Sequence, residues 1–570
     1  MGYKWSMRGP HGRLDLNGKT TMRLTSSIAL ILAAVACQLG CAPRDPVALL
    51  APPTIAPNPN GAAPLAAVVR VRAADAAWAR LDVFQGADQW SLPCAAADLA
   101  RGLLPVTRLR ADEPHRIRVV LGGRLGKIIA SAPLAYRPPK TPGDPTEFPR
   151  ITVAVADADR LEPGLTLFNP RRRMTGAAMR TNDEFGMLAA VDNQGHVVWT
   201  YRCNSRISDF RRLRNDHLVV ITQDYRLIEI DLLGNIHRQW VAAGRPQGPA
   251  ADAIPVETTT FHHSVKELPN GNFLILGSTR RQIPDYYTSE DDANAPRKTQ
   301  WVMGDEILEF RPDDGHVVWR WDAFDHLDPM RIGYQTFSRY WGRRGFPGTV
   351  DWSHANNITL SPDGRTILCN SRTLSAIIAI NRSDGEIQWI AGEPTGWSRQ
   401  LQPKLLSLAD ADERWFWHQH APEWTDRGTL MLFNNDNYRA RPFTPGAPPS
   451  AIRSHAAEYE LDLADGTIRR VWTSLIPGVR PPATWAMGSA QPLKTTGNVL
   501  AGYGLAFRLE DLAQATWATR MEYLSETEVI EFSRTDPPEI LWRMTLTGQA
   551  PHVGWSLFGA RRVPSLRMTP

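Results

Sequence analysis

After residue 160 the sequence repeats one short pattern six times: an apolar strand, a turn rich in Gly, Asn and Asp, and a second strand that ends in tryptophan. Each repeat is typical of a β-hairpin. A further strand pair usually lies upstream, for example around Phe273–Leu276 and Thr366–Cys369. About four strands per repeat, six times over, predict a six-bladed β-propeller. The tryptophans that end the six hairpins are Trp199, Trp240, Trp319, Trp389, Trp472 and Trp542.

Two further segments lie outside these hairpins, Leu165–Asn169 and His552–Leu566. We expect them to supply the strands that close the ring. The sequence shows no capping repeat, which an open solenoid would need. A tryptophan at the same place in every repeat predicts packing between neighbouring blades rather than chemistry.

The all-β expectation extends upstream of the propeller. Short alternating strands separated by Gly, Pro and Asp turns predict a small N-terminal β-sandwich over residues 65–150. The propeller is expected over 160–570. Residues 42–64, rich in Pro, Ala and Asn, are expected to form a disordered linker.

Residues 1–41 resemble an export leader. Arg23 precedes the apolar run Ile28–Ala36, which is too short for a permanent membrane-spanning helix. Met22 is the more natural start, because it leaves a compact basic segment. Small residues before Cys37 or Cys41 resemble a bacterial lipoprotein box, with either cysteine as the lipidation site. We therefore expect an exported, periplasmic protein with a lipid anchor in the membrane.

The net charge argues against a nucleic-acid partner, and the spacing of the cysteines argues against a cysteine metal site. Most of the net charge of +5 comes from residues 1–36, so the mature chain is nearly neutral and nucleic acid is not an expected partner. Cys94, Cys203 and Cys369 are widely spaced, with no metal-type spacing among them.

Three of the repeats carry a histidine ahead of a turn and an alternating strand. His263 and His420 lie eight residues before the turn glycine, and His354 lies ten residues before it. If the repeats pack around an axis, these histidines converge. Arg372 follows the strand after His354, and the chain return there is expected to bring it toward the same channel.

The pattern leaves two choices open, because His262 precedes His263 and His418 lies two residues before His420. A structural role would recur in every repeat, as the tryptophan does. The sixth repeat instead has Met487-Gly488-Ser489 at this place. The histidines therefore indicate a functional centre.

At this point the chain resembles the bacterial exported arylsulfate sulfotransferases. The resemblance lies in QHAP followed by GTLMLFNND, in DWSHANN with SRTLSAIIAI, and in the terminal ARRVPSL, and it covers residues of about 65–566. It implies a six-bladed propeller behind a small β-sandwich. It also implies transfer of a sulfuryl group from a phenolic sulfate ester to a phenol, without a nucleotide donor or another cofactor.

The resemblance also implies roles for individual residues. His420 matches the histidine that becomes transiently sulfated. His263, His354, Asn356 and Arg372 match the residues around it. Phe558 stands where the family is expected to carry a tyrosine, which affects how the phenol is positioned. The cysteine pair seen in some members has no counterpart after His420.

The proposed chemistry also follows from the residue types. A neutral imidazole is a competent nucleophile, and a covalent intermediate divides the transfer into two easier displacements, a ping-pong scheme. Sulfuryl transfer resembles phosphoryl transfer in requiring mainly positioning and charge stabilisation. The planar fork of Arg372 suits two sulfonate oxygens. Gly122–Lys127 lacks the spacing and the Ser or Thr of a nucleotide phosphate loop.

Three other hypotheses compete with this one. Histidines in a propeller channel are also typical of an iron or zinc site, although a neighbouring arginine disfavours a cation. A non-enzymatic binding propeller on the cell surface is a second alternative, and hydrolysis of the ester is a third. The sequence leaves the physiological substrates and the oligomeric state, including a homodimer, open.

Overall fold

The computed structural model describes residues 47–176 and 182–567. Within these ranges the chain is almost entirely β-strand, and the only α-helices are the short α2 (Ala96–Arg101) and α3 (Ala323–His326). No helix of the described residues is long and apolar enough to cross a membrane. The predicted leader, with Cys37 and Cys41, lies outside the described residues.

The N-terminal unit contains two main sheets that bury one shared core. The larger sheet has the order β10-β8-β5-β6, with β9 beside β8, and the smaller sheet has the order β2-β3-β7. The short strands β1 and β4 form a separate pair. The core is made of Val, Leu, Ile and Ala side chains from both sheets. The strands are β1 (Ala48–Leu49), β2 (Thr54–Pro57), β3 (Ala67–Arg70), β4 (Ala73–Ala74), β5 (Ala76–Gln85), β6 (Asp88–Pro93), β7 (Leu103–Val106), β8 (His115–Gly123), β9 (Ile128–Ala130) and β10 (Leu134–Tyr136).

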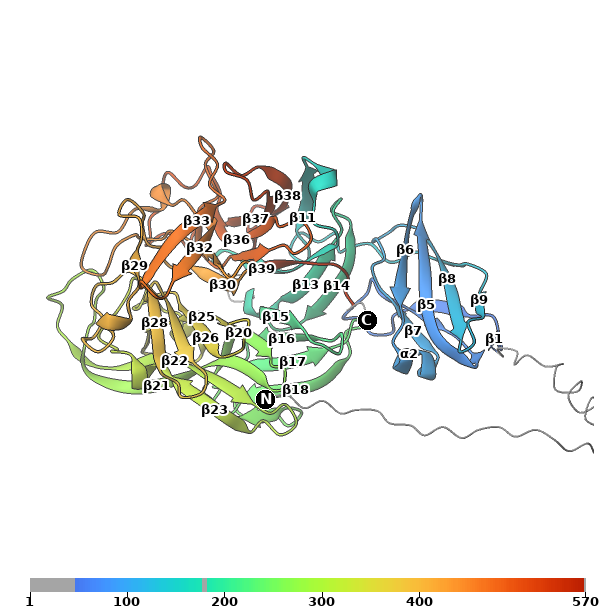
Figure 1. Cartoon of the computed structure of the whole chain (residues 1–570), viewed down its shortest axis with the longest axis horizontal. Coiled ribbons are helices and arrows are strands. Elements are labelled where there is room, and N and C mark those ends of the chain that lie inside the picture. Colours follow the sequence, from blue (N-terminus) through green and yellow to red (C-terminus); the bar gives the residue numbers. More distant parts are fainter. Residues whose placement is uncertain (1–46, 177–181, 568–570) are drawn as a thin grey trace, which may run out of the picture.

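The predicted disordered linker over 42–64 is wrong for its described part. Strand β2 pairs with β3 at the edge of the smaller sheet, where proline is tolerated because one side of the strand needs no hydrogen-bond donors. The next residues bind the propeller: Asn58 donates to the carbonyl of Leu233 at 2.8 Å, and Arg202 N–H donates to the carbonyl of Ala62 at 2.8 Å. This segment therefore connects the two units as ordered structure (Figure 1).

Six sheets of four to six strands form the rest of the chain, as the repeats predict. The first blade contains β12 (Leu165–Met174), β13 (Gly186–Val191), β14 (Val197–Cys203) and β39 (Val553–Val563). The second contains β15 (Ile207–Arg212), β16 (Leu218–Thr222), β17 (Arg226–Ile230), β18 (Ile236–Ala242) and β19 (Ile254–Val256). The third contains β20 (Phe261–Glu267), β21 (Phe273–Tyr286), β22 (Lys298–Phe310), β23 (Val317–Asp322) and β24 (Thr349–Asp351).

The other three blades follow the same up-and-down order. The fourth blade contains β25 (Ala355–Leu360), β26 (Thr366–Ser371), β27 (Ala376–Asn381) and β28 (Ile387–Gly392). The fifth contains β29 (Ser407–Leu408), β30 (His420–Trp424), β31 (Leu430–Asn434), β32 (His455–Asp462) and β33 (Thr467–Thr473). The sixth contains β11 (Arg150–Val155), β34 (Thr484–Ala486), β35 (Ser489–Pro492), β36 (Val499–Phe507), β37 (Ser525–Phe532) and β38 (Ile540–Thr547).

The ring is closed by strands from both ends of the propeller sequence. Strand β39 pairs with β12 and forms the inner strand of the first blade, as expected for the two segments left outside the hairpins. Strand β11 pairs with β38 at the outer edge of the sixth blade, so the propeller begins at Arg150 rather than near residue 160. Inner strands contact one another around the whole ring, in the order β39, β15, β20, β25, β30, β35 and back to β39.

The repeated tryptophans join neighbouring blades. Trp199 donates its indole N–H to the carbonyl of Leu232, in a turn of the next blade, at 2.9 Å. Trp240, Trp472 and Trp542 make the corresponding bond. In the third blade the predicted Trp319 is half-buried, and Trp321 makes the bond instead, to Gly385 at 3.0 Å. The two residues lie on the same face of β23 because side chains alternate along a strand.

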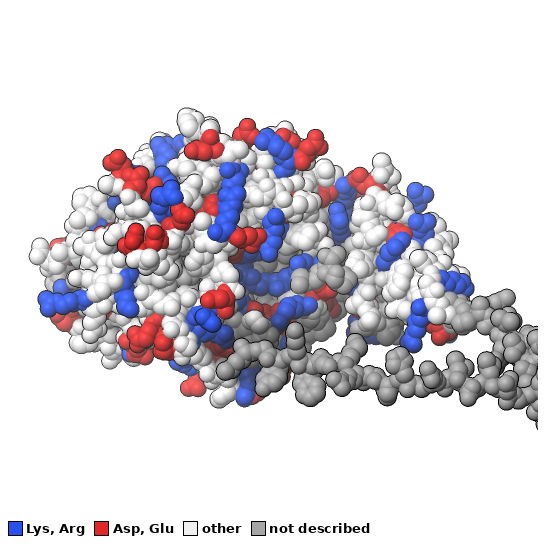
Figure 2. All heavy atoms as spheres, in the orientation of Figure 1, with Lys and Arg blue, Asp and Glu red and all other residues white. Residues whose placement is uncertain are grey.

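Basic and acidic side chains are interspersed over the face of the molecule drawn in Figure 2. Several ion pairs join the two units, including Arg110 with Asp192 at 3.0 Å and Arg567 with Asp98 at 3.1 Å. The N-terminal unit is therefore held against the first blade and the C-terminal residues (Figure 1).

Candidate active site

The inner strands that carry the predicted histidines are irregular. Their ladders shift register within β20, at the start of β25 and within β30. The backbone has positive φ at His263 (52°), His354 (41°) and Ala421 (50°). Bulges of this kind turn side chains away from the normal alternation, and a positive φ is costly for a residue with a side chain. The strained backbone is therefore what directs these side chains into the channel.

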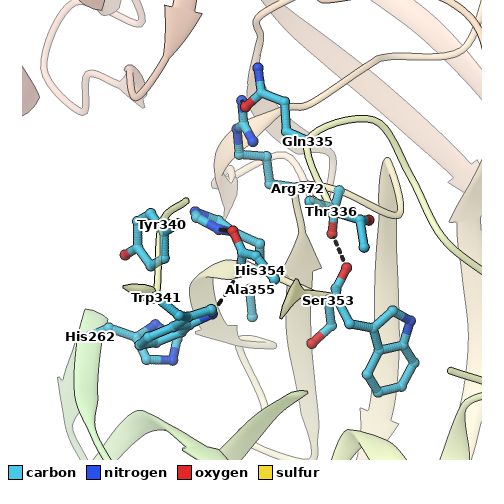
Figure 3. Close-up of polar contacts among 12 residues, drawn as sticks. His262, Gln335, Thr336, Tyr340, Trp341, Ser353, His354, Ala355 and Arg372 are labelled. Carbon is cyan, nitrogen blue, oxygen red and sulfur yellow. Dashed lines mark hydrogen bonds and ion pairs between the residues drawn. The ribbon is translucent and has the colours of Figure 1, made fainter. Parts of the chain in front are cut away.

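One cavity of about 210 Å³ gathers most of the predicted site. His263, His354, Arg372, His420 and Phe558 all line it. The ring centroids of His263 and His354 are 5.1 Å apart, and those of His263 and Phe558 are 5.7 Å apart. Figure 3 shows His354 between Tyr340 and Arg372. The predicted convergence of side chains from separate repeats is present in the structure.

The hydrogen bonds of His420 fix which ring nitrogen is basic. Its Nδ1 lies 2.6 Å from the side-chain oxygen of Asn435 and 3.1 Å from the carbonyl of His418. The amide nitrogen of Asn435 donates to Thr484 and to the carbonyl of Met487, both at 2.8 Å, so its oxygen must be the acceptor. Nδ1 therefore carries the proton, and the lone pair is on Nε2.

The lone pair of His420 is directed at the sixth blade. The backbone N–H of Met487 donates to Nε2 at 3.1 Å, from a residue with φ of 63°. Met487 occupies the place where three of the repeats have histidine. Because one lone pair serves one partner, reaction at Nε2 requires this contact to open.

His420 is neutral over a wide pH range. Burial lowers the pKa of the imidazole to about 3, and the nearby guanidinium of Arg372 adds to this effect because it repels a positive charge. The side chain is almost fully buried. A neutral imidazole keeps its lone pair, which is the form that a nucleophile requires.

His354 is paired with a carboxylate. Its Nδ1 donates to Asp351 at 2.6 Å, and the other oxygen of Asp351 accepts the indole N–H of Trp341 at 2.8 Å. Asp351 ends β24, which pairs with β22 because β21 and β22 extend far beyond the body of their blade. A buried carboxylate on Nδ1 fixes the tautomer and stabilises the protonated ring.

His263 is held by its neighbour in sequence. His262 Nε2 donates toward the carbonyl of Gly277 at 2.9 Å and the carboxylate of Asp305 at 3.2 Å. Its Nδ1 is 2.8 Å from Nδ1 of His263. Burial and the surrounding histidines lower the pKa of His263 well below its ordinary value. In the neutral pair, His263 Nδ1–H donates to His262, and the lone pair of His263 is on Nε2.

Arg372 reaches the cavity from the turn after β26. Its backbone N–H donates to the carbonyl of His354 at 3.1 Å, which connects the two site residues directly. One terminal nitrogen donates to Gln335 at 2.5 Å and to the carbonyl of Trp485 at 3.2 Å. The Nε atom is buried and has no hydrogen-bond partner among the described residues. A buried guanidinium with an unused donor is suited to an anion.

The remaining candidates lie in different places. Asn356 is outside the cavity lining: its side chain bonds Asn370 at 2.6 Å and the carbonyl of Gln419 at 2.9 Å, and so supports the residue before His420. His418 is also buried outside the lining, with its ring against Tyr438. His262 lies behind His263. Of each pair that the sequence left open, His420 and His263 are the members that line the cavity.

Comparison with known proteins assigns the chain to a family. The sequence profile of the family described as Arylsulfotransferase (ASST) matches residues 150–543, which is most of the propeller. The chain belongs to the arylsulfotransferase family.

Two curated arylsulfotransferases are similar over part of their length. Arylsulfate sulfotransferase AssT of Lelliottia amnigena is 26% identical over 251 residues, and AssT of Escherichia coli O6:H1 (strain CFT073) is 28% identical over 251 residues. Each alignment covers 37% of this chain and 39% of the relative.

Solved structures are more distant from this arylsulfotransferase family member. A protein of unknown function from Bacteroides caccae has 10% identity and a TM-score of 0.36, over 70% of this chain and 98% of that chain. The β-propeller domain of Cps50 (Swd1) from Myceliophteria thermophila has 10% identity and a TM-score of 0.32, over 71% and 99%. The six-bladed architecture therefore rests on the strand pairings.

Several residues of this arylsulfotransferase site were not predicted from the sequence. Asp351 lies three residues before His354, and that spacing is a signal that could have identified it. Asp305 and Tyr340 come from a distant strand and a long loop, and nothing local marks them. Among the described residues, no group of three or more His, Cys, Asp or Glu side chains is arranged to hold a metal ion.

Proposed function

We propose that this protein transfers a sulfuryl group from a phenolic sulfate ester to a phenol through a sulfohistidine at His420. The observation that carries the proposal is the shared cavity of His263, His354, Arg372 and His420 in a member of the arylsulfotransferase family. The predicted export leader and lipid anchor are part of the same proposal, since an exported enzyme fits a donor that needs no nucleotide.

In the first half-reaction, the lone pair of His420 Nε2 attacks sulfur. A nitrogen–sulfur bond forms, the bond between sulfur and the ester oxygen breaks, and its electron pair leaves with the phenolate. His354 gives that oxygen a proton, and Asp351 at 2.6 Å stabilises the charged ring before transfer. The unused Nε–H of Arg372 is suited to a sulfonate oxygen, whose charge it would hold through the transition state.

The second half-reaction is the reverse with a new phenol. His354 takes the proton of the acceptor hydroxyl, the phenol oxygen attacks sulfur, and the bond to His420 breaks. His263 is neutral, and its free Nε2 is suited to accept a hydrogen bond from the hydroxyl as the acceptor enters. Phe558, beside His263, supplies an apolar surface for the phenol ring.

The direct test is an assay of purified protein with a chromogenic aryl sulfate and a phenol. We expect the wild type to form the new sulfate ester, and His420→Ala to lose activity by on the order of 10⁴-fold. His316→Asn, in an exposed turn of the third blade, is the matched control and should retain full activity. Release of inorganic sulfate without a new ester would indicate hydrolysis, and equal activity of wild type and His420→Ala would contradict the proposal.

A further inference from the structure

The cavity is lined by far more positive than negative charge. Its lining includes a single carboxylate, Asp351, which is already bound to His354. The lining also includes seven arginines from five separate parts of the chain: Arg171, Arg173, Arg206, Arg343, Arg344, Arg372 and Arg520.

Most of these arginines are held by neutral groups. Arg171 donates to the carbonyls of Ile207 at 3.1 Å and Ser208 at 2.8 Å, and Arg173 donates to the carbonyl of Met521 at 2.9 Å. Carbonyl oxygens orient a guanidinium without cancelling its charge. Among the described residues, Arg206 alone of the seven forms an ion pair, with Asp183 at 2.9 Å.

The charges are close enough to repel one another. The pKa of Arg173 is lowered to about 10, mainly by burial and further by Arg343 and Arg520. The pKa of Arg343 is lowered by burial and by Arg344. A cluster of like charges that is largely removed from water is costly, and a bound anion relieves that cost.

One sulfonate group does not account for this cluster. The proposed reaction places the sulfonate between His420 and Arg372, and a monoanionic ester brings one negative charge. The other arginines would then enclose an uncharged part of the substrate. A neutral ring can stack on a guanidinium, as Phe558 does on Arg171, but it leaves the positive charge unneutralised, whereas a second anionic group on that ring would pair with it.

Building on the proposed sulfuryl transfer, we propose that the substrates are aryl compounds with a second anionic substituent on the ring, held by the arginines around Arg173 and Arg343. The second group is a carboxylate or a sulfonate that takes no part in the transfer. It positions the ring, so that the reacting sulfate lies at His420.

The inference is tested with matched donors on the full-length protein. 4-Sulfooxybenzoate carries the second charge, and 4-sulfooxybenzamide has the same shape without it; 4-sulfooxybenzenesulfonate separates a sulfonate preference from a carboxylate preference. We expect kcat/KM for the benzoate to exceed that for the benzamide by about ten- to hundredfold, the range for a charge-assisted hydrogen bond. The advantage should shrink as salt is raised.

Two variants locate the effect. Arg343→Gln should reduce the ratio of benzoate to benzamide several-fold. Arg339→Gln, four residues earlier in the same loop and outside the cavity lining, should leave the ratio at the wild-type value. Equal kcat/KM for charged and uncharged donors in the wild type would overturn the inference while leaving sulfuryl transfer intact. Failure to transfer from any donor would instead contradict the proposed function.

Discussion

His262 and His263 are consecutive in the sequence, yet their Nδ1 atoms face each other at 2.8 Å, with the ring planes at 86°. The positive φ of His263 and the register shift in β20 make this contact possible. Since His262 Nε2 is fixed from behind by the carbonyl of Gly277 and by Asp305, the pair transmits a preferred tautomer from these buried acceptors to a ring that lines the cavity.

The substitution Asp305→Asn tests this arrangement. The amide would present N–H to His262 Nε2 in competition with the carbonyl of Gly277, so that the tautomer with a lone pair on His263 Nε2 is favoured less strongly. We expect kcat/KM for the phenol to fall about 10- to 100-fold, with little change in the rate of labelling by donor alone. Asp313→Asn, exposed in the same blade, is the control. Equal loss in both half-reactions would indicate a merely structural role for Asp305.

The pair of Asp351 and His354 predicts that the loss of kcat/KM in a variant without the carboxylate depends on how good a leaving group the donor carries. Without the carboxylate, His354 loses the partner that holds its ring and stabilises the charged form, and a poor leaving group suffers most because it needs the proton most. In Asp351→Asn we expect kcat/KM for phenyl sulfate to fall at least tenfold more than that for 4-nitrophenyl sulfate. The ratio is measured across a series of substituted phenyl sulfates. An equal loss for all donors would rule out proton donation by His354.

The low pKa of His420 predicts activity in acid. A histidine with the ordinary pKa of 6.5 would be only about 3% neutral at pH 5. Because burial and Arg372 lower the pKa of His420 to about 3, the ring stays neutral down to nearly that pH. The rate of labelling by donor alone should therefore not fall between pH 7 and pH 5 through loss of the His420 lone pair. A fall of tenfold or more over that interval would show that His420 titrates near its ordinary pKa.

Two tryptophans in one strand provide a matched pair for stability. Trp321→Phe removes the indole N–H and leaves the buried carbonyl of Gly385 without this donor. We expect a loss of about 1–3 kcal/mol in the free energy of unfolding, measured with urea. Trp319→Phe, two residues earlier and half-buried, should cost less than about 0.5 kcal/mol. A larger loss for Trp319→Phe would contradict the assignment of the contact between blades.

The sequence predicted the architecture because a propeller repeats its signal. Each of the six hairpins has a turn of similar composition and ends in one tryptophan. This repetition makes the prediction secure even where a single strand is ambiguous. The errors fell where the signal is not repeated. The proline-rich segment before Ala67 has the composition of a linker, and only its pairing with β3 makes it a strand. Trp319 and Trp321 share one face, so the sequence could not decide between them.

The histidines of the site could be predicted from the sequence, whereas the cluster of arginines that lines the cavity could not. His263, His354 and His420 could be found because they recur at one place in the repeat. Met487, which caps His420, contributes a backbone N–H, and any residue type could do so. The arginines around Arg173 and Arg343 come from loops and strands far apart in the sequence, and only the closed ring brings them to one cavity.

The most direct test of the account is intact-mass analysis of the protein after incubation with an aryl sulfate and no acceptor, followed by peptide mapping. We expect one SO₃ group per chain, on the peptide that contains His420, lost again when a phenol is added. The adduct should be absent from His420→Ala and present in His316→Asn. Turnover without any adduct, or an adduct on a peptide that lacks His420, would contradict the sulfohistidine mechanism.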